Sequence, residues 1–278
     1  MATYGERRRV PGLRREELAL LAGVSASYYT RLEQGVSCHA SAEVLDAIAR
    51  ALRLDETELH HLRDLATACR HRATTRRPPA EQLAPAVRDL VRTLDEVPVV
   101  VTGRRSDVLA WNRLGHALLA GHVDPAGPER SAQRPNMARL VFLDAHTREL
   151  YADWPAKARA VVGNLRLVAG RHPQDARLTS LVGELTTRSA DFARLWADHR
   201  VRACDTAEYD LRHPLVGPLT VGQQTLTGAS EPEQSVVMVT AVPGSASAAA
   251  LKLLAQATMA TAAAPALPSG ENAVTRTG

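Results

Sequence analysis

Long apolar runs and cysteines are both scarce in this sequence, and each scarcity argues against a class of protein. No run of about 18 apolar residues occurs, so a membrane-spanning helix is not expected. The opening residues MATYGERRRVPG lack the apolar core of a secretory signal peptide. The three cysteines stand far apart without a C-x-x-C pair, so neither a disulfide nor a cysteine zinc site is predicted. We therefore expect a cytoplasmic protein.

Catalytic motifs are also missing. The sequence contains no P-loop, no G-x-G-x-x-G and no G-x-S-x-G. His60 and His61 are adjacent, but ELHH lacks the second histidine of the zinc motif H-E-x-x-H. We predict that the protein is not an enzyme and uses no cofactor. The net charge of +4 is compatible with nucleic acid as a partner but does not require it.

Changes in composition divide the chain into zones. HRATTRRPPAEQ is polar and interrupted by two prolines, as a linker is. ATMATAAAPALPSGENAVTRTG is rich in small and polar residues and predicts a disordered tail. The predicted zones are a helical domain over 1–70, a linker and connecting helix over 71–96, a mixed helix and strand domain over 97–256, and the tail over 257–278.

The stretch GLRREELALLAGVSASYYTRLEQG, residues 12–35, has the pattern of two short helices that cross through a tight turn. Gly23 stands in the turn, Ser25 is placed to cap the second helix, and small Ala19 stands where the helices come closest. Apolar residues fill the positions expected to be buried, namely Leu18, Ala22, Val24, Tyr29 and Leu32. The pattern indicates a helix-turn-helix; a plain helical hairpin inside a core is the alternative.

The outer face of the second helix would enter the major groove of DNA, and its side chains are polar. Arginine and glutamine can form paired hydrogen bonds with base edges. The start of the preceding helix offers backbone N–H groups and arginines to phosphate. The predicted DNA-binding residues are Arg14, Arg15, Ser25, Ser27, Tyr28, Thr30, Arg31 and Gln34.

Long segments of the chain resemble one family. LRREELALLAGVSASYYTRLEQG and ASAEVLDAIARALRLDETELHHLRDLA resemble the xenobiotic-response-element (XRE) type of helix-turn-helix regulator. Later segments, including DVLAWN, RLVFLDAHTRELYADW and LRHPLVGPLT, resemble the actinobacterial branch that carries an MmyB-like C-terminal domain. The resemblance implies an all-α helix-turn-helix domain followed by an α+β, PAS-like domain with a ligand cavity between sheet and helices.

One departure from that family concerns the first helix, which normally precedes RRRVPGLRREE and packs on the helices after it. Only a few residues precede this segment here, and MATYGE has no apolar helical pattern. Without that helix, apolar surface that contributes a few kcal/mol at ~25 cal/mol per Å² would be exposed. Two explanations stay open: the true start lies upstream, or the protein is shortened and its DNA-binding domain is impaired.

The second domain begins with VPVVVTGRRSDVLAWNRLGHALLAG, a pattern of strand, turn, strand and helix. Three helical patterns, three strand patterns and a last helix follow, so an α+β sheet domain is predicted. Its few aromatic residues either line a pocket or fill the core. Basic side chains at the pocket mouth would meet the carboxylate of the long-chain apolar ligand, such as a fatty acid, that the resemblance suggests. The predicted ligand-binding residues are Trp111, Phe142, Tyr151, Trp154, Arg159, Phe192, Trp196, His199 and His213.

Two functions follow from these patterns. The first is a transcription regulator that binds double-stranded DNA and responds to a small apolar ligand. Because one helix-turn-helix covers one half-site and paired half-sites lie ~34 Å apart, this function predicts a homodimer. The second is a ligand-binding or protein-interaction module whose DNA-binding head does not work.

Overall fold

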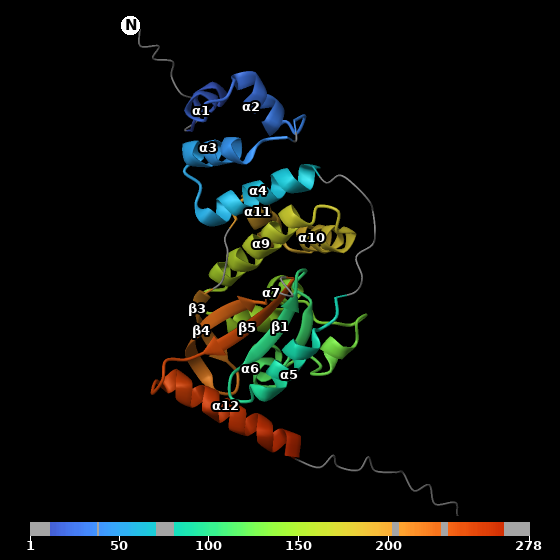
Figure 1. Ribbon diagram of the computed structural model, residues 1–278. Helices are drawn as coiled ribbons and strands as arrows, with labels where there is room; N and C mark the ends of the chain where they lie inside the picture. Colours follow the sequence, from blue (N-terminus) through green and yellow to red (C-terminus); the bar gives the residue numbers. More distant parts are fainter. Residues whose placement is uncertain (1–11, 38, 71–80, 202–205, 229–232, 264–278) are drawn as a thin grey trace, which may run out of the picture.

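The computed structural model describes residues 12–37, 39–70, 81–201, 206–228 and 233–263. Its first part is a stack of four helices at one end of the molecule, and the last of them lies against the second part (Figure 1). The bounds are α1 Arg15–Leu21, α2 Ala26–Glu33, α3 Ala42–Leu52 and α4 Glu56–Arg70.

Local chemistry fixes the crossing of α1 and α2. Gly23 adopts φ +67°, a left-handed conformation that side chains disfavour, and so permits the tight turn. The Ser25 hydroxyl accepts a hydrogen bond from the Tyr28 N–H at 3.2 Å and caps α2. Leu18, Ala19 and Ala22 are buried. The predicted helix-turn-helix is confirmed, but Val24, Tyr29 and Leu32, which were expected to be buried, are only half-buried.

The second part is built on a five-stranded antiparallel sheet of order β2-β1-β5-β4-β3. Its strands are β1 Val99–Gly103, β2 Val108–Trp111, β3 Thr206–His213, β4 Gly217–Thr227 and β5 Gln234–Thr240. Six α-helices lie between β2 and β3 in sequence. Strand β1 pairs with β5, so the first hairpin lies beside the last strand of the sheet. The predicted fold class, all-α followed by α+β, is confirmed.

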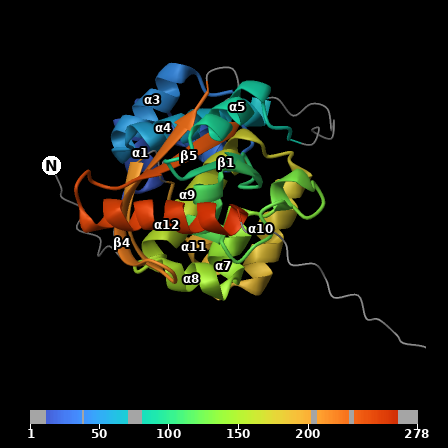
Figure 2. The same cartoon turned by 90° about the horizontal axis from the view of Figure 1, so that it is seen from below.

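Helices cover both faces of the sheet. The helices after the four at the head are α5 Pro85–Thr93, α6 Arg113–Ala120, α7 Met137–Leu143, α8 Ala145–Leu150, α9 Trp154–Arg171, α10 Ala176–Arg188, α11 Ala190–Ala197 and α12 Ala246–Ala263, with a 3-10 turn at Gly127–Glu129. One face packs on α5 through a small apolar cluster that includes Val91, Val101 and Val236. The other face turns toward the main core and α9. Seen from below, α12 lies across the end of the molecule opposite α1 and α2 (Figure 2).

Two expectations from sequence need correction. The tail was predicted from residue 257, but α12 continues to Ala263, because the run of alanines there has high helix propensity. Cys69 is disulfide-bonded, although distance along the chain argued against any disulfide. Separation in sequence does not limit how closely a fold brings two residues together. The remainder of the predicted tail, and Cys38 and Cys204, lie outside the described residues.

No helix within the described part of the chain is long and apolar enough to cross a membrane.

Asn112 joins three elements of the second part. Its Oδ1 accepts hydrogen bonds from the N–H groups of Gly115 at 2.7 Å and Val99 at 3.0 Å, and so caps α6 and anchors β1. Its Nδ2 donates to the carbonyls of Leu94 and Val97, just beyond α5. The side chain is buried, so water cannot replace these bonds.

We predict that Asn112→Ala lowers the free energy of unfolding by about 2–4 kcal/mol, because it leaves several buried backbone groups without partners. Urea denaturation followed by circular dichroism measures the loss. Ser189→Ala, which removes the single 3.2 Å capping bond of α11, is the control and should cost about 1 kcal/mol. An equal, small effect of both substitutions would contradict the role of Asn112.

Candidate functional sites

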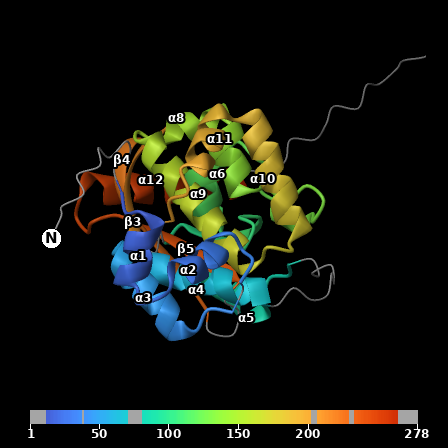
Figure 3. The ribbon, with the colours of Figure 1, turned by 90° about the horizontal axis from the view of Figure 1, so that it is seen from above.

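The outer face of α2 is accessible at the end of the molecule opposite α12 (Figure 1). From above, α1 and α2 lie in front of the rest of the chain (Figure 3). Ser27, Arg31 and Gln34 are exposed there. These three side chains include the two predicted residues best able to form paired hydrogen bonds with bases.

Three other predicted DNA-binding residues have roles within the helix pair. The Ser25 hydroxyl is the cap of α2, and it lies 3.2 Å from the Ser27 hydroxyl. Thr30 Oγ1 donates to the Ala26 carbonyl at 2.8 Å, and the Tyr28 hydroxyl donates to the His39 carbonyl at 3.4 Å. The polar groups of these three residues are thus partly committed to contacts within the protein, whereas Arg31 and Gln34 are exposed.

The two arginines at the start of α1 differ in their surroundings. Arg14 is the residue that caps α1, and its N–H donates to the Glu17 carboxylate at 2.9 Å. Arg15 donates through Nε to the carboxylate of Glu33, at the end of α2. That hydrogen bond and the charge of Glu33 raise the pKa of Arg15. Arg15 thus fastens α1 to α2, and a phosphate would have to compete with Glu33 for it.

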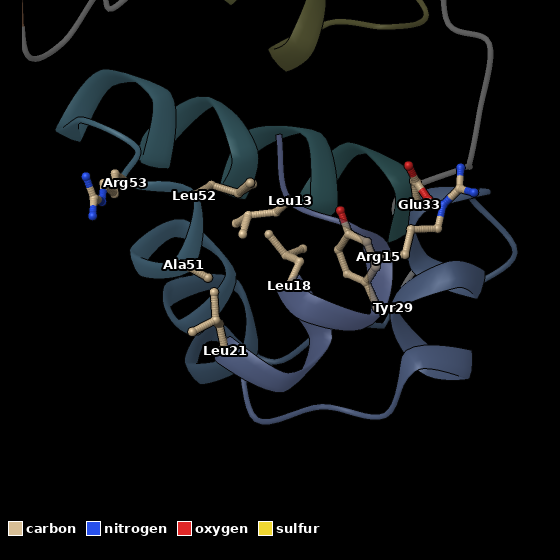
Figure 4. Close-up of a pocket in the computed structure, with 9 residues that line it drawn as sticks. All are labelled: Leu13, Arg15, Leu18, Leu21, Tyr29, Glu33, Ala51, Leu52 and Arg53. Atoms are coloured by element: carbon tan, nitrogen blue, oxygen red, sulfur yellow. Dashed lines mark hydrogen bonds and ion pairs between the residues drawn. The ribbon is translucent and has the colours of Figure 1, made fainter. Parts of the chain in front are cut away.

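A hollow of about 430 Å³, with both apolar and charged walls, opens on the head between α1, α2 and α3 (Figure 4). Its walls are Leu13, Arg15, Leu18, Leu21, Tyr29, Glu33, Ala51, Leu52 and Arg53. Leu13, Leu21 and Leu52 are 47%, 63% and 44% exposed. Leu52, the last residue of α3, lies at this open surface. Apolar surface on the head was expected from the sequence, and here it forms a hollow.

A second cavity, of about 440 Å³, lies between α9 and the sheet. On the helix it follows one face, through Lys157, Ala160, Val161, Asn164, Leu167, Val168 and Arg171. Lys157 and Arg171 are fourteen residues apart, so at ~1.5 Å per residue this face is about 21 Å long. On the sheet, alternate residues line the cavity, among them Val100, Thr102, Tyr209, Gln223, Thr225, Ser235 and Val237. The cavity is therefore elongated, with apolar side chains interspersed with hydroxyl and amide groups.

Lys157 lies at the buried end of this cavity. It is 7% exposed, and its Nζ donates to Gln223 Oε1 at 3.0 Å. The rings of Tyr209 and Tyr151 lie 4.7 Å and 5.1 Å from Nζ. No carboxylate among the described residues forms an ion pair with it. Burying a cation without a counter-charge is costly, so this end of the cavity favours an anionic group.

The other end of the cavity has cations that are already paired. Arg104 lies 3.1 Å from Asp175 and 3.3 Å from Glu81 and from Glu233. Burial opposes ionisation of Asp175, but hydrogen bonds from the Leu178 N–H and Arg105 hold its pKa below the usual value. Burial raises the pKa of Glu81, and the two arginines offset only part of that effect. An anionic ligand group gains less here than beside Lys157.

The aromatic residues predicted to bind ligand do not line this cavity. Phe142, Trp154 and Phe192 are buried in edge-on contacts, with ring centroids 5.0–5.7 Å apart, and Trp196 stacks on Phe192. Trp111 Nε1 donates to the Pro125 carbonyl at 2.8 Å. Tyr151 touches the cavity only indirectly, through Lys157. These six side chains lie outside the lining of this cavity, and Phe142, Trp154 and Phe192 instead pack in the main core.

The three basic residues predicted at the pocket mouth are also elsewhere. Arg159 is exposed on α9, outside the cavity face. His199 is exposed, and its Nδ1 lies 3.0 Å from Arg166 Nη1. His213 is buried; its Nδ1 accepts from the Leu215 N–H, so its Nε2 donates to the Ala117 carbonyl. Burial lowers the pKa of His213, and the residue shapes the turn between β3 and β4.

The cavity residues that sequence reasoning missed are Lys157, Tyr209 and Gln223 on the buried end, and Thr57 and His60, which α4 contributes. One signal was available. Lys157 and Lys252 are the only lysines among 34 basic residues, and Lys157 begins a helical face that includes Ala160, Val161, Leu167 and Val168. The contribution of α4 could not be read from local patterns, since it comes from the other part of the chain.

Comparison with known families agrees with this geometry. A model of the helix-turn-helix domain matches residues 5–62, and a model described as the MmyB-like transcription regulator ligand binding domain matches residues 83–254. A comparison with curated proteins finds no match. Both matched families are regulatory, and neither is a family of enzymes. Since the second match covers more than half of the chain, the protein belongs to the MmyB-like family and is a helix-turn-helix transcription regulator with a ligand-binding domain.

Proposed function

We propose that this regulator reads a specific duplex sequence with α2 and is controlled by an amphipathic carboxylate, such as a fatty acid, held between α9 and the sheet. The observation that carries the ligand assignment is the buried ammonium group of Lys157, at one end of an elongated cavity. The carboxylate pairs with Lys157, and the alkyl chain runs along Val161, Leu167 and Val168 toward α4. The cavity volume of about 440 Å³ suits a small ligand.

On DNA, Arg31 and Gln34 contact base edges with Ser27 beside them, and Arg14 contacts phosphate. A single helix of this length covers one half-site, so the regulator acts as a homodimer on half-sites ~34 Å apart. α2 contributes no residue to the lining of the cavity, so DNA on α2 and the carboxylate in the cavity bind at the same time.

We predict that Arg31→Ala weakens specific DNA binding by roughly 1–3 kcal/mol, because a pair of hydrogen bonds to a base edge is lost. Fluorescence anisotropy with a labelled duplex selected by the wild-type protein gives the two dissociation constants. Arg92→Ala, which removes an exposed arginine on α5, is the control for lost positive charge. If the two variants bind alike, α2 does not read the bases through Arg31.

We predict that a gel shift of the 278-residue protein on DNA from upstream of its own coding region weakens steeply as salt rises. Each phosphate contact adds about −0.9 to the slope of log K against log salt, and Arg14→Gln should make that slope shallower by about 1. A flat response would argue against phosphate contacts by these arginines. If the folded protein does not shift the DNA, the result favours a ligand-binding or protein-interaction module that does not bind DNA.

We predict that the protein binds dodecanoate about 10- to 100-fold more tightly than dodecanol, since a hydrogen bond to a charged group contributes roughly 1.5–3 kcal/mol. Lys157→Met keeps most of the side-chain volume and should remove this preference. Lys252→Met, which alters the exposed lysine on α12, should keep it. Isothermal titration calorimetry measures all six affinities. A preference that survives in Lys157→Met would refute the placement of the carboxylate.

A further inference from the structure

The ligand cavity is walled in part by the DNA-binding head. Thr57 and His60 of α4 line it, together with α9 and the sheet. α4 packs along α9, so that α9 lies between the head and the sheet (Figure 1). A ligand that fills the end of the cavity near Arg171 therefore touches a helix of the head directly.

The contact of α4 with α9 is unusually close at one point. A Cβ atom added to Gly170 of α9 would lie 2.4 Å from Cε1 and 2.7 Å from Nδ1 of His61. The His61 ring therefore rests on the backbone of α9, at a position where only glycine leaves room. Its Nδ1 is buried and has no hydrogen-bond partner in the part of the chain that the structure describes. Burial lowers the pKa of His61, and the charge of Asp64 offsets part of this effect.

An ion pair reinforces this contact. Arg171 lines the cavity, and its Nε lies 3.0 Å from Asp64 Oδ2 of α4. The pair is about half exposed, and exposed ion pairs contribute little to stability. The position of α4 on α9 is therefore set mainly by the close contact of His61 with Gly170. Within the head, Arg63 of α4 lies 2.7 Å from Asp46 of α3, and α3 packs on α1. Contacts thus run without a break from the cavity to the helix-turn-helix.

We propose that ligand occupancy is transmitted to the DNA-binding head through α4, which the ligand touches at Thr57 and His60 and which is seated on α9 by His61 against Gly170. This inference rests on the ligand cavity proposed above. A bound ligand adds contacts only when α4 is seated on α9, so it favours the seated position over any other. In that position α3 and the helix-turn-helix are held in one orientation relative to the second part of the chain.

Hydrogen exchange of the full-length protein with and without dodecanoate tests this route. In the wild type, dodecanoate should slow exchange in α9 and β4 and also in α4 and α3, by about 5-fold or more, the lower end of usual coupling factors. In Gly170→Ala the new methyl group pushes His61 away, so α9 and β4 should still respond while α3 does not. Gly183→Ala is the matched control, because a Cβ there meets nothing within 4 Å.

His61→Ala provides a second variant that leaves α9 unchanged. It removes the ring that seats α4, so α3 should again lose its response while the cavity keeps it. If dodecanoate slows hydrogen exchange in the wild type only in α9 and β4, the inference is overturned, although ligand binding in the cavity is still supported. A response of α3 that persists in both variants would overturn the route through His61. If dodecanoate changes no segment, the proposed ligand site fails and the inference fails with it.

Discussion

The structure depends on the packing of one helix, α9, between the sheet and the DNA-binding head. Its cavity face follows the sheet without filling the space, which leaves an elongated cavity with Lys157 at its buried end. Its C-terminal end supports α4, where Gly170 lets His61 reach the helix backbone. The same helix therefore lines the cavity and packs against α4 of the DNA-binding head. A regulator needs such a shared element, because a ligand changes DNA binding only when it interacts differently with two arrangements of the head.

The two ends of the cavity differ in their electrostatics. At the end near α4, the cations Arg104 and Arg171 are already paired with carboxylates of the protein. At the buried end, Lys157 has a neutral hydrogen-bond partner and two aromatic rings. An acidic ligand therefore gains most by placing its charge beside Lys157 and its apolar part toward α4. In the proposed orientation, the end of the alkyl chain lies at Thr57 and His60.

The sequence was sufficient for the helix-turn-helix, because that feature depends on local rules, whereas the short helices α7 and α8 were not predicted. Gly23 at a positive φ, the Ser25 cap and the 3.6-residue apolar period specify the helix-turn-helix within a short window. The lining of the cavity beside α9 was not predicted, because apolar character alone does not tell on which side of α9 a residue lies. Phe142 and Phe192 fill the core, whereas Lys157, which reads as a surface residue, is buried. The wall from α4 depends on packing between distant segments, which no local pattern records.

The central claim is that one protein binds DNA and an acidic amphiphile in a coupled manner. The most direct test is the dissociation constant of dodecanoate, measured by calorimetry for the full-length protein with and without a saturating duplex. Because coupling between two ligands is reciprocal, the account predicts that DNA changes this constant by the same factor by which dodecanoate changes the constant for DNA, about 5-fold or more. An identical constant for dodecanoate in both conditions would contradict the account.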